Sequence, residues 1–157
     1  MCAGGVPIKN NTNPVDVVLA AFEIRDFIGR LKREQSEKGH ALWKIRIGVH
    51  TGSIISGVVG KKKFAYDIWG DTVNTASRLE QTSYPNKVNI SGETYELVKD
   101  FFECTYRGKV PVKHKGEIDM YFADRIKKEL SADDDGRIPN QNFLEMLEKL
   151  NGPGDGL

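Results

Sequence analysis

The side chains best suited to chemistry in this chain are Asp67, Asn74 and Arg78, which fall within twelve residues of one another. A carboxylate can accept a hydrogen bond from the exocyclic amine of a nucleobase, and an amide can hold a sugar oxygen. A guanidinium can fork onto phosphate oxygens. The three groups together therefore suit a nucleotide. Taken alone, Asn74 and Arg78 are more typical of the solvated face of a helix.

A strand that runs directly into a helix is expected to position these groups. Residues 64–69 alternate as a strand does, and Gly70 then interrupts the pattern. Asp71 is expected to be the N-cap of the helix that follows. Asn74 and Arg78 are four residues apart, so they share one face of that helix.

Four segments of the chain, in order, resemble the C-terminal half of a class III nucleotidyl cyclase catalytic domain. They are IRIGVHTGSIISGVVG (45–60), YDIWGDTVNTASRLE (66–80), VNISGETYELV (88–98) and VKHKGEIDMYF (112–122). The resemblance implies conversion of a nucleoside triphosphate into a 3′,5′-cyclic monophosphate and pyrophosphate, within intracellular signal transduction. It also implies an α/β fold with a ferredoxin-like, mainly antiparallel sheet, helices on one face and a projecting hairpin.

The resemblance assigns roles to individual residues. Asp67 would accept from the adenine amino group, and the backbone of Ile68 and Trp69 would line the purine slot. Asn74 would position the ribose. Arg78 would stabilise the charge that develops on the α-phosphate.

One further residue is assigned to the phosphates, and Asp67 bears on the choice of base. Lys113 aligns with a lysine of the family that holds the terminal phosphates. Asp67 favours ATP, because a carboxylate would face the O6 acceptor of guanine, and guanylyl members tend to have Cys or another small residue there. An adenylyl cyclase is therefore expected. The alternatives are a guanylyl cyclase and a non-catalytic cyclase-like module that binds nucleotide or dimerises.

The family's site forms between two domains and uses two Mg²⁺ or Mn²⁺ ions held by two Asp residues. Those Asp residues are expected upstream of Met1, so this chain would contribute no metal ligand. Asp71 and Asp119 are not expected to converge as a pair. The chain would work as a homodimer or as a heterodimer with another cyclase domain, and a homodimer of this chain alone is expected to be inactive.

The amino-acid composition is ordinary for one soluble globular domain. The 157 residues are 39% hydrophobic and 29% charged, and the net charge of +1 indicates neither nucleic acid nor a membrane surface as a partner. The two cysteines imply no disulfide framework and fit a reducing, cytoplasmic compartment. No apolar run approaches the ~20 residues that a membrane helix needs.

The rest of the chain shows the sequence patterns of helices and strands. A helix is expected from an N-cap at Asn13 to about Gln35, and its buried stripe is expected at Val17, Ala21, Ile24, Ile28 and Leu31. Strands are expected at 42–50, 88–90, 102–112 and 118–126, with a hairpin turn at 60–63. We expect a partial cyclase domain over 1–126, and a linker with a short amphipathic helix over 127–157. The acidic turn 131–136 resembles a calcium loop but lacks its bidentate Glu.

Overall fold

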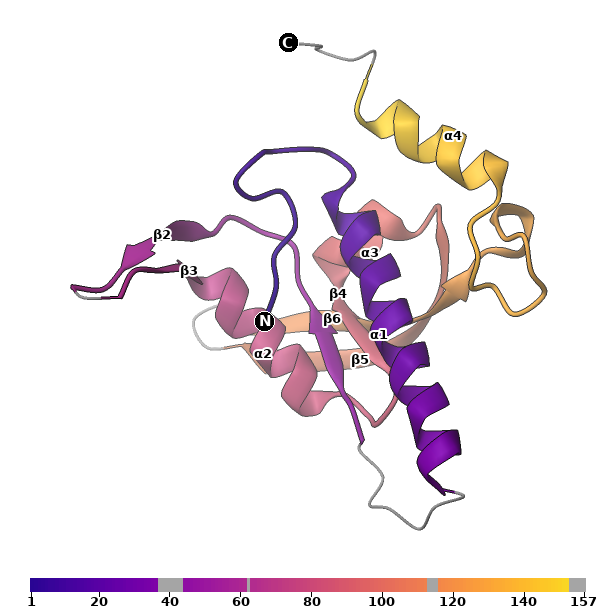
Figure 1. Cartoon of the computed structure of the whole chain (residues 1–157), viewed down its shortest axis with the longest axis horizontal. Coiled ribbons are helices and arrows are strands. Elements are labelled where there is room, and N and C mark those ends of the chain that lie inside the picture. Colours follow the sequence, from indigo (N-terminus) through magenta and orange to yellow (C-terminus); the bar gives the residue numbers. More distant parts are fainter. Residues whose placement is uncertain (37–43, 62, 113–115, 153–157) are drawn as a thin grey trace.

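The computed structural model describes residues 1–36, 44–61, 63–112 and 116–152. Helices and short strands are interspersed along the chain, and two longer strands follow one another in its C-terminal half (Figure 1). In chain order they are α1 (Asn13–Ser36), β1 (Ile47–Val49), β2 (Ile55–Val59), β3 (Ala65–Trp69), α2 (Asp71–Thr82), β4 (Val88–Ser91), α3 (Gly92–Val98), β5 (Phe102–Val112), β6 (Gly116–Ile126), the 3₁₀ helix η1 (Lys128–Leu130) and α4 (Gln141–Leu150).

The main sheet has four strands in the order β1-β4-β6-β5. The β1–β4 pair is parallel, and the β4–β6 and β5–β6 pairs are antiparallel. Strands β2 and β3 form a separate antiparallel hairpin that projects from the body (Figure 1). The mainly antiparallel α/β fold with a projecting hairpin is therefore confirmed. The strand expected at 102–112 is observed with those bounds.

Helix α1 begins one residue earlier than the sequence pattern indicates. The carbonyl of Thr12 accepts from the backbone N–H of Asp16, and the Thr12 hydroxyl donates to the Asp16 carboxylate at 2.8 Å. Asn13 is the first helical residue, and its side chain donates back to the carbonyl of Asn10. The expected N-cap at Asn13 is thus wrong by one position, because the Thr12 carbonyl already accepts the first backbone hydrogen bond of the helix.

The buried stripe of α1 also differs from the expected one. Its core residues are Val15, Val18, Ala21 and Phe22, and the Phe22 ring packs edge-to-face on that of Phe102. Ile24 leaves 46% of its surface exposed. The core residues all lie in the first half of the helix. Apolar spacing predicts a stripe over the whole helix, but only the part that lies over the sheet is covered.

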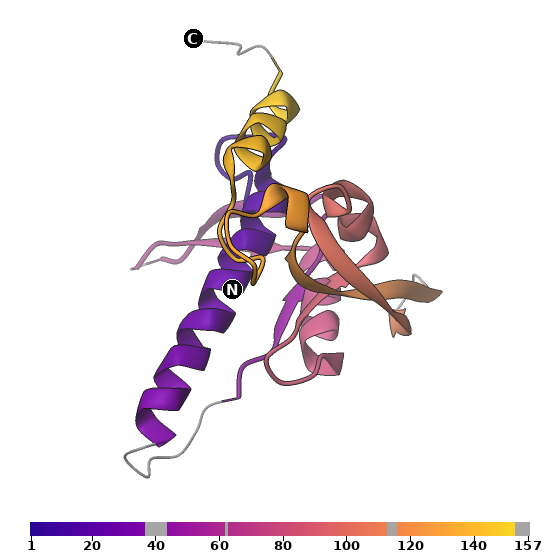
Figure 2. The same ribbon diagram turned by 90° about the vertical axis from the view of Figure 1, so that its right-hand side faces the viewer.

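The helices lie on both faces of the main sheet, whereas one face was expected. Helices α1 and α3 pack with β4 and β6 around Val88, Ile90 and Ala123. Helix α2 packs on the other face through Leu79, which meets Met120 of β6. Figure 2 shows α1 and α2 on the two sides of β1. The strands of the sheet carry apolar side chains on both faces, so each face needs a helix to cover it.

The C-terminal segment contributes to the same core. Phe143 of α4 is fully buried, and its ring lies 5.0 Å from that of Phe101. The Asn140 side chain caps α4 by accepting from the backbone N–H of Phe143. Leu130 of η1 joins the cluster. The expected amphipathic helix is present, and the division of the chain at residue 126 stays a prediction.

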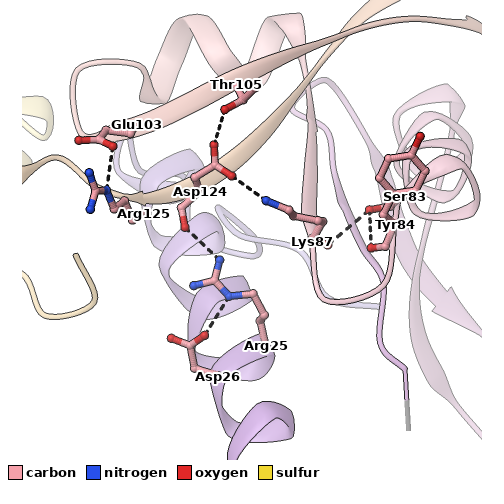
Figure 3. A network of polar contacts seen from close by, with 9 residues as sticks. All are labelled: Arg25, Asp26, Ser83, Tyr84, Lys87, Glu103, Thr105, Asp124 and Arg125. Carbon is pink, nitrogen blue, oxygen red and sulfur yellow. Dashed lines mark hydrogen bonds and ion pairs between the residues drawn. The ribbon is translucent and has the colours of Figure 1, made fainter. Parts of the chain in front are cut away.

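A polar network joins α1 to the sheet (Figure 3). The carboxylate of Asp124 accepts from Lys87 Nζ at 3.1 Å and from the Thr105 hydroxyl at 2.7 Å. The Asp124 carbonyl accepts from the guanidinium of Arg25, which also pairs with Asp26. Four segments of the chain are therefore tied together at one end of the sheet. Among the described residues, no helix is long and apolar enough to cross a membrane.

Candidate functional site

Strand β3 passes into helix α2 through a single glycine. Gly70 has φ +123°, a backbone conformation that other residues rarely adopt. Its carbonyl accepts from the backbone N–H groups of Val73 and Asn74. Gly70 is therefore the N-cap, and Asp71 is the first residue of the helix. The expectation that Asp71 caps α2 is wrong, because the glycine itself makes the turn and no side chain caps the helix.

Helix α2 has a buried face and an exposed face. Thr72, Thr75 and Leu79 point into the protein. A Cβ at Gly48 of β1 would lie 2.4 Å from the carbonyl oxygen of Ala76, so the helix backbone rests directly on this strand. This close approach fixes which face of α2 is turned outward.

Asn74 and Arg78 lie on the exposed face of α2, as their spacing predicts. The Asn74 side chain makes no hydrogen bond to another residue that the structure describes. One Nη of Arg78 donates to Oε1 of Gln81 at 3.4 Å, a long contact. Both groups are therefore available to a ligand or to a second protein chain.

Asp67 and its neighbours lie on the projecting hairpin. Asp67 is exposed, and its Oδ1 accepts from the backbone N–H of Ile68 at 2.9 Å. Alternation along β3 turns Asp67 and Trp69 to one face of the hairpin, and turns Tyr66 and Ile68 to the other. The Trp69 ring lies beside Gly57 of β2, where a Cβ would be in van der Waals contact with the ring at 3.5 Å.

A cleft of about 1290 Å³ opens between α1, the edge of β1, α2 and the N-terminal segment. Ile68, Asn74 and Tyr66 line it. The structure thus brings Ile68 and Asn74 to one cleft. The described lining does not include Asp67, Trp69 or Arg78; the first two lie on β3 and the third on α2. Lys113 lies outside the described residues.

His50, Ser53 and Thr72, which the sequence did not single out, also line this cleft. His50, whose side chain is 3% exposed, has Nδ1 2.7 Å from the hydroxyl of Ser91. Ser91 in turn caps α3, where it accepts from the backbone N–H of Thr94. His50 directly follows β1, and this contact pairs one of its ring nitrogens within the protein. Thr72 donates to the carbonyl of Ser53 at 2.6 Å. In the sequence, the one feature related to the contact between Thr72 and Ser53 is that Thr72, a hydroxyl residue, lies two positions after Gly70.

The described residues contain no group of three or more His, Cys, Asp or Glu side chains that could hold a metal ion. Asp119 accepts from the hydroxyl of Tyr106 at 2.8 Å, which raises the pKa of that tyrosine. Asp71 is exposed at the start of α2. Asp71 lies on α2 and Asp119 on β6, and we assign no metal ligand to the described part of this chain. Ligands supplied from elsewhere stay a prediction.

The chain matches a family model described as the adenylate and guanylate cyclase catalytic domain, over residues 1–125. Human guanylyl cyclase C is 39% identical over 155 residues, which cover 96% of this chain and 14% of that protein. The chain therefore spans a small part of this curated relative.

Two solved structures resemble the fold at similar levels. The guanylate cyclase domain of RhGC from Catenaria anguillulae, in complex with GTP, is 32% identical with a TM-score of 0.70, over 78% of this chain and 65% of that one. The adenylyl cyclase CyaB from P. aeruginosa is 29% identical with a TM-score of 0.73, over 80% of this chain and 67% of that one. With the family match over most of the chain, these likenesses show that the protein belongs to the class III adenylyl and guanylyl cyclase catalytic domain family.

Proposed function

We propose that this chain binds ATP and positions it for conversion into 3′,5′-cyclic AMP and pyrophosphate. The observation that carries the proposal is the arrangement around Gly70. Asp67 is exposed on β3, and the helix that starts at once after this glycine presents Asn74 and Arg78 on its outer face. A base acceptor, a ribose ligand and a phosphate ligand thus follow one another along one structural unit.

Each residue has a distinct part in the proposed reaction. Asp67 accepts from the adenine amine, next to the backbone of Ile68 and Trp69. Asn74 orients the ribose so that its 3′-hydroxyl faces the α-phosphorus. Arg78, whose one described side-chain bond is long, turns to the α-phosphate and stabilises the negative charge of the transition state.

The proposal includes Lys113 and a second cyclase domain. Lys113 holds the terminal phosphates. The second domain, in a homodimer or heterodimer, closes the site, because the proposed ligand groups of α2 face outward. Two Mg²⁺ or Mn²⁺ ions belong to the proposal, with carboxylate ligands from outside this chain. We place the activity in the cytoplasm, in signal transduction.

A guanylyl cyclase is the second candidate. The similarity to human guanylyl cyclase C and to the GTP-bound domain of RhGC supports it. Asp67 supports ATP, because a carboxylate has no proton to donate to O6 of guanine.

Substitution of Asp67 by Asn tests the choice of base. The amide can donate to O6 of guanine, so we expect the ratio of ATP to GTP turnover to fall by about tenfold in the variant. Turnover is measured with Mn²⁺ after mixing the chain with a cyclase domain that carries the family's metal carboxylates. The control is Asp100→Asn, an exposed carboxylate in the turn before β5.

The outcomes separate the candidates. A wild-type preference for ATP that Asp67→Asn weakens supports the adenylyl cyclase. A wild-type preference for GTP favours the guanylyl cyclase. Nucleotide binding, measured by calorimetry, without turnover in the mixed complex points to a non-catalytic module and overturns the proposal.

A further inference from the structure

The hairpin β2–β3 has few attachments to the rest of the described chain. Its two strands pair with each other and with no described strand of the main sheet. Strand β3 reaches α2 through Gly70, and glycine is the most permissive residue for backbone rotation. The angle between the hairpin and α2 therefore needs a second constraint, because Asp67 lies on one and Asn74 on the other.

Thr72 supplies a contact in the right place. Its hydroxyl donates to the carbonyl of Ser53 at 2.6 Å, and its side chain is 9% exposed. Ser53 lies two residues before β2. The bond thus ties the entry of the hairpin to the first turn of α2, while Gly70 ties its exit to the same turn.

The surrounding glycines leave room for this contact. A Cβ at Gly52 would lie 2.7 Å from the Thr72 hydroxyl oxygen, too close for two atoms that are not bonded. A Cβ at Gly70 would lie 4.0 Å from the Ser53 carbonyl oxygen. The segment before β2 and the residue after β3 therefore both lie at the start of α2, where the two glycines have no side chains to separate them.

We propose that Thr72 is a positioning residue, whose bond to the Ser53 carbonyl sets the orientation of the β2–β3 hairpin on α2. This bond thereby fixes the position of Asp67, the proposed base-binding residue, relative to Asn74 and Arg78. The consequence for catalysis rests on the proposed function, whereas the consequence for the hairpin does not. In this proposal Thr72 acts through the hairpin and not on the substrate.

Thr72→Val tests the proposal, because valine keeps the shape and removes the donor. We expect kcat/KM for ATP in the mixed complex to fall by about tenfold to a hundredfold, the scale of a small misplacement of reacting groups. Thr72→Ser keeps the hydroxyl and should restore most of the activity. The matched control is Thr75→Val, since Thr75 is also buried in α2 but donates within the helix, to the Asp71 carbonyl at 2.8 Å.

Gly52→Ala tests the same contact with Thr72 unchanged. The new methyl group should push the Thr72 hydroxyl away from Ser53 and reproduce the loss of activity. This second variant decides the matter even if Thr72→Val does not fold. Equal losses in Thr72→Val and Thr75→Val, or wild-type activity in Thr72→Val and Gly52→Ala, would overturn the proposal.

Amide hydrogen exchange provides a readout that needs no nucleotide. We expect exchange in β2 and β3 to accelerate in Thr72→Val and Gly52→Ala, while β4 and β6 keep the wild-type rate. Unchanged exchange in the hairpin shows that Thr72 does not hold it, and the inference fails. If the wild-type chain neither binds nor converts nucleotide, the proposed function fails, and the exchange data still decide the role of Thr72.

Discussion

Asn74 and Arg78 are polar residues on an outward helix face, and the fold makes little use of either side chain. Substitution of such residues has little effect on stability. A large effect on activity would therefore report their chemistry and not a loss of structure. The same logic does not apply to Thr72, whose side chain is buried between two segments.

Arg78→Ala should lower kcat for ATP by about 10²–10³, with little change in KM, because a donor that acts on the transition state is lost. Steady-state turnover in the mixed complex measures both constants. Gln81→Ala is the control, since it removes the described hydrogen-bond partner of Arg78 and no proposed ligand. An unchanged kcat in Arg78→Ala contradicts the assigned role.

The two cysteines should differ sharply in reactivity. Burial raises the pKa of Cys104 to about 12, with a smaller contribution from the nearby Asp124 carboxylate. Only about one molecule in ten thousand then carries the Cys104 thiolate at pH 8. Cys2 is exposed.

We expect iodoacetamide at pH 8 to modify Cys2 in the folded protein and to modify Cys104 only after unfolding in urea. Peptide mass spectrometry measures the modified fraction at each site. Because the folded pKa is raised, any stability that the protonated Cys104 thiol contributes is present below the unfolded pKa and is lost as pH rises toward 12. Equal labelling of both cysteines in the folded protein would show that Cys104 is not protected.

At the scale of elements, the C-terminal helix α4 illustrates how one residue can attach a segment to a core. Phe143 is fully buried among the rings of Phe101 and Phe102, whereas Leu144 beside it is 45% exposed. The two residues therefore form a matched pair on one helix. One anchors α4, and the other faces away from this core.

Phe143→Ala should lower the free energy of unfolding by about 3–5 kcal/mol, because a buried ring leaves a cavity. Leu144→Ala should cost less than about 1 kcal/mol. The midpoint of urea unfolding, followed by tryptophan fluorescence, measures both. Losses of similar size would indicate that α4 does not depend on the Phe143 contact.

At the scale of the whole molecule, apolar side chains gather on the projecting hairpin. Six of them, on both strands and at the connection between them, are at least 39% exposed: Ile55, Val58, Val59, Phe64, Tyr66 and Trp69. Alternation places them on both faces of the hairpin. Exposed apolar side chains gathered on one element mark interaction sites. It agrees with the proposed second cyclase domain.

We expect the chain to self-associate through this hairpin. Phe64→Lys should weaken association by at least about tenfold, because the side chain is 76% exposed and would place a charge in an apolar contact. Sedimentation equilibrium measures the dissociation constant. Leu97→Lys, at a 50% exposed apolar residue of α3, is the control. A chain that stays monomeric, or an equal effect of both variants, contradicts this assignment.

The sequence by itself determined the family, the strand–glycine–helix unit around Gly70 and most of the strands. These features depend on local patterns: alternation over 64–69 predicts β3, and a spacing of four places Asn74 and Arg78 on one face. Such patterns act within a few residues, so they can be read without knowing the partner segments.

The tertiary structure alone decided which surfaces are covered. Ile24 fits the apolar stripe of α1 yet is exposed, and α2 covers the face of the sheet opposite to α1. The bond between Thr72 and Ser53 joins residues nineteen apart in sequence. Periodicity shows that a helix has an apolar side, but not what lies against it. Burial and long-range hydrogen bonds depend on where other segments pack, and only the assembled fold contains that information.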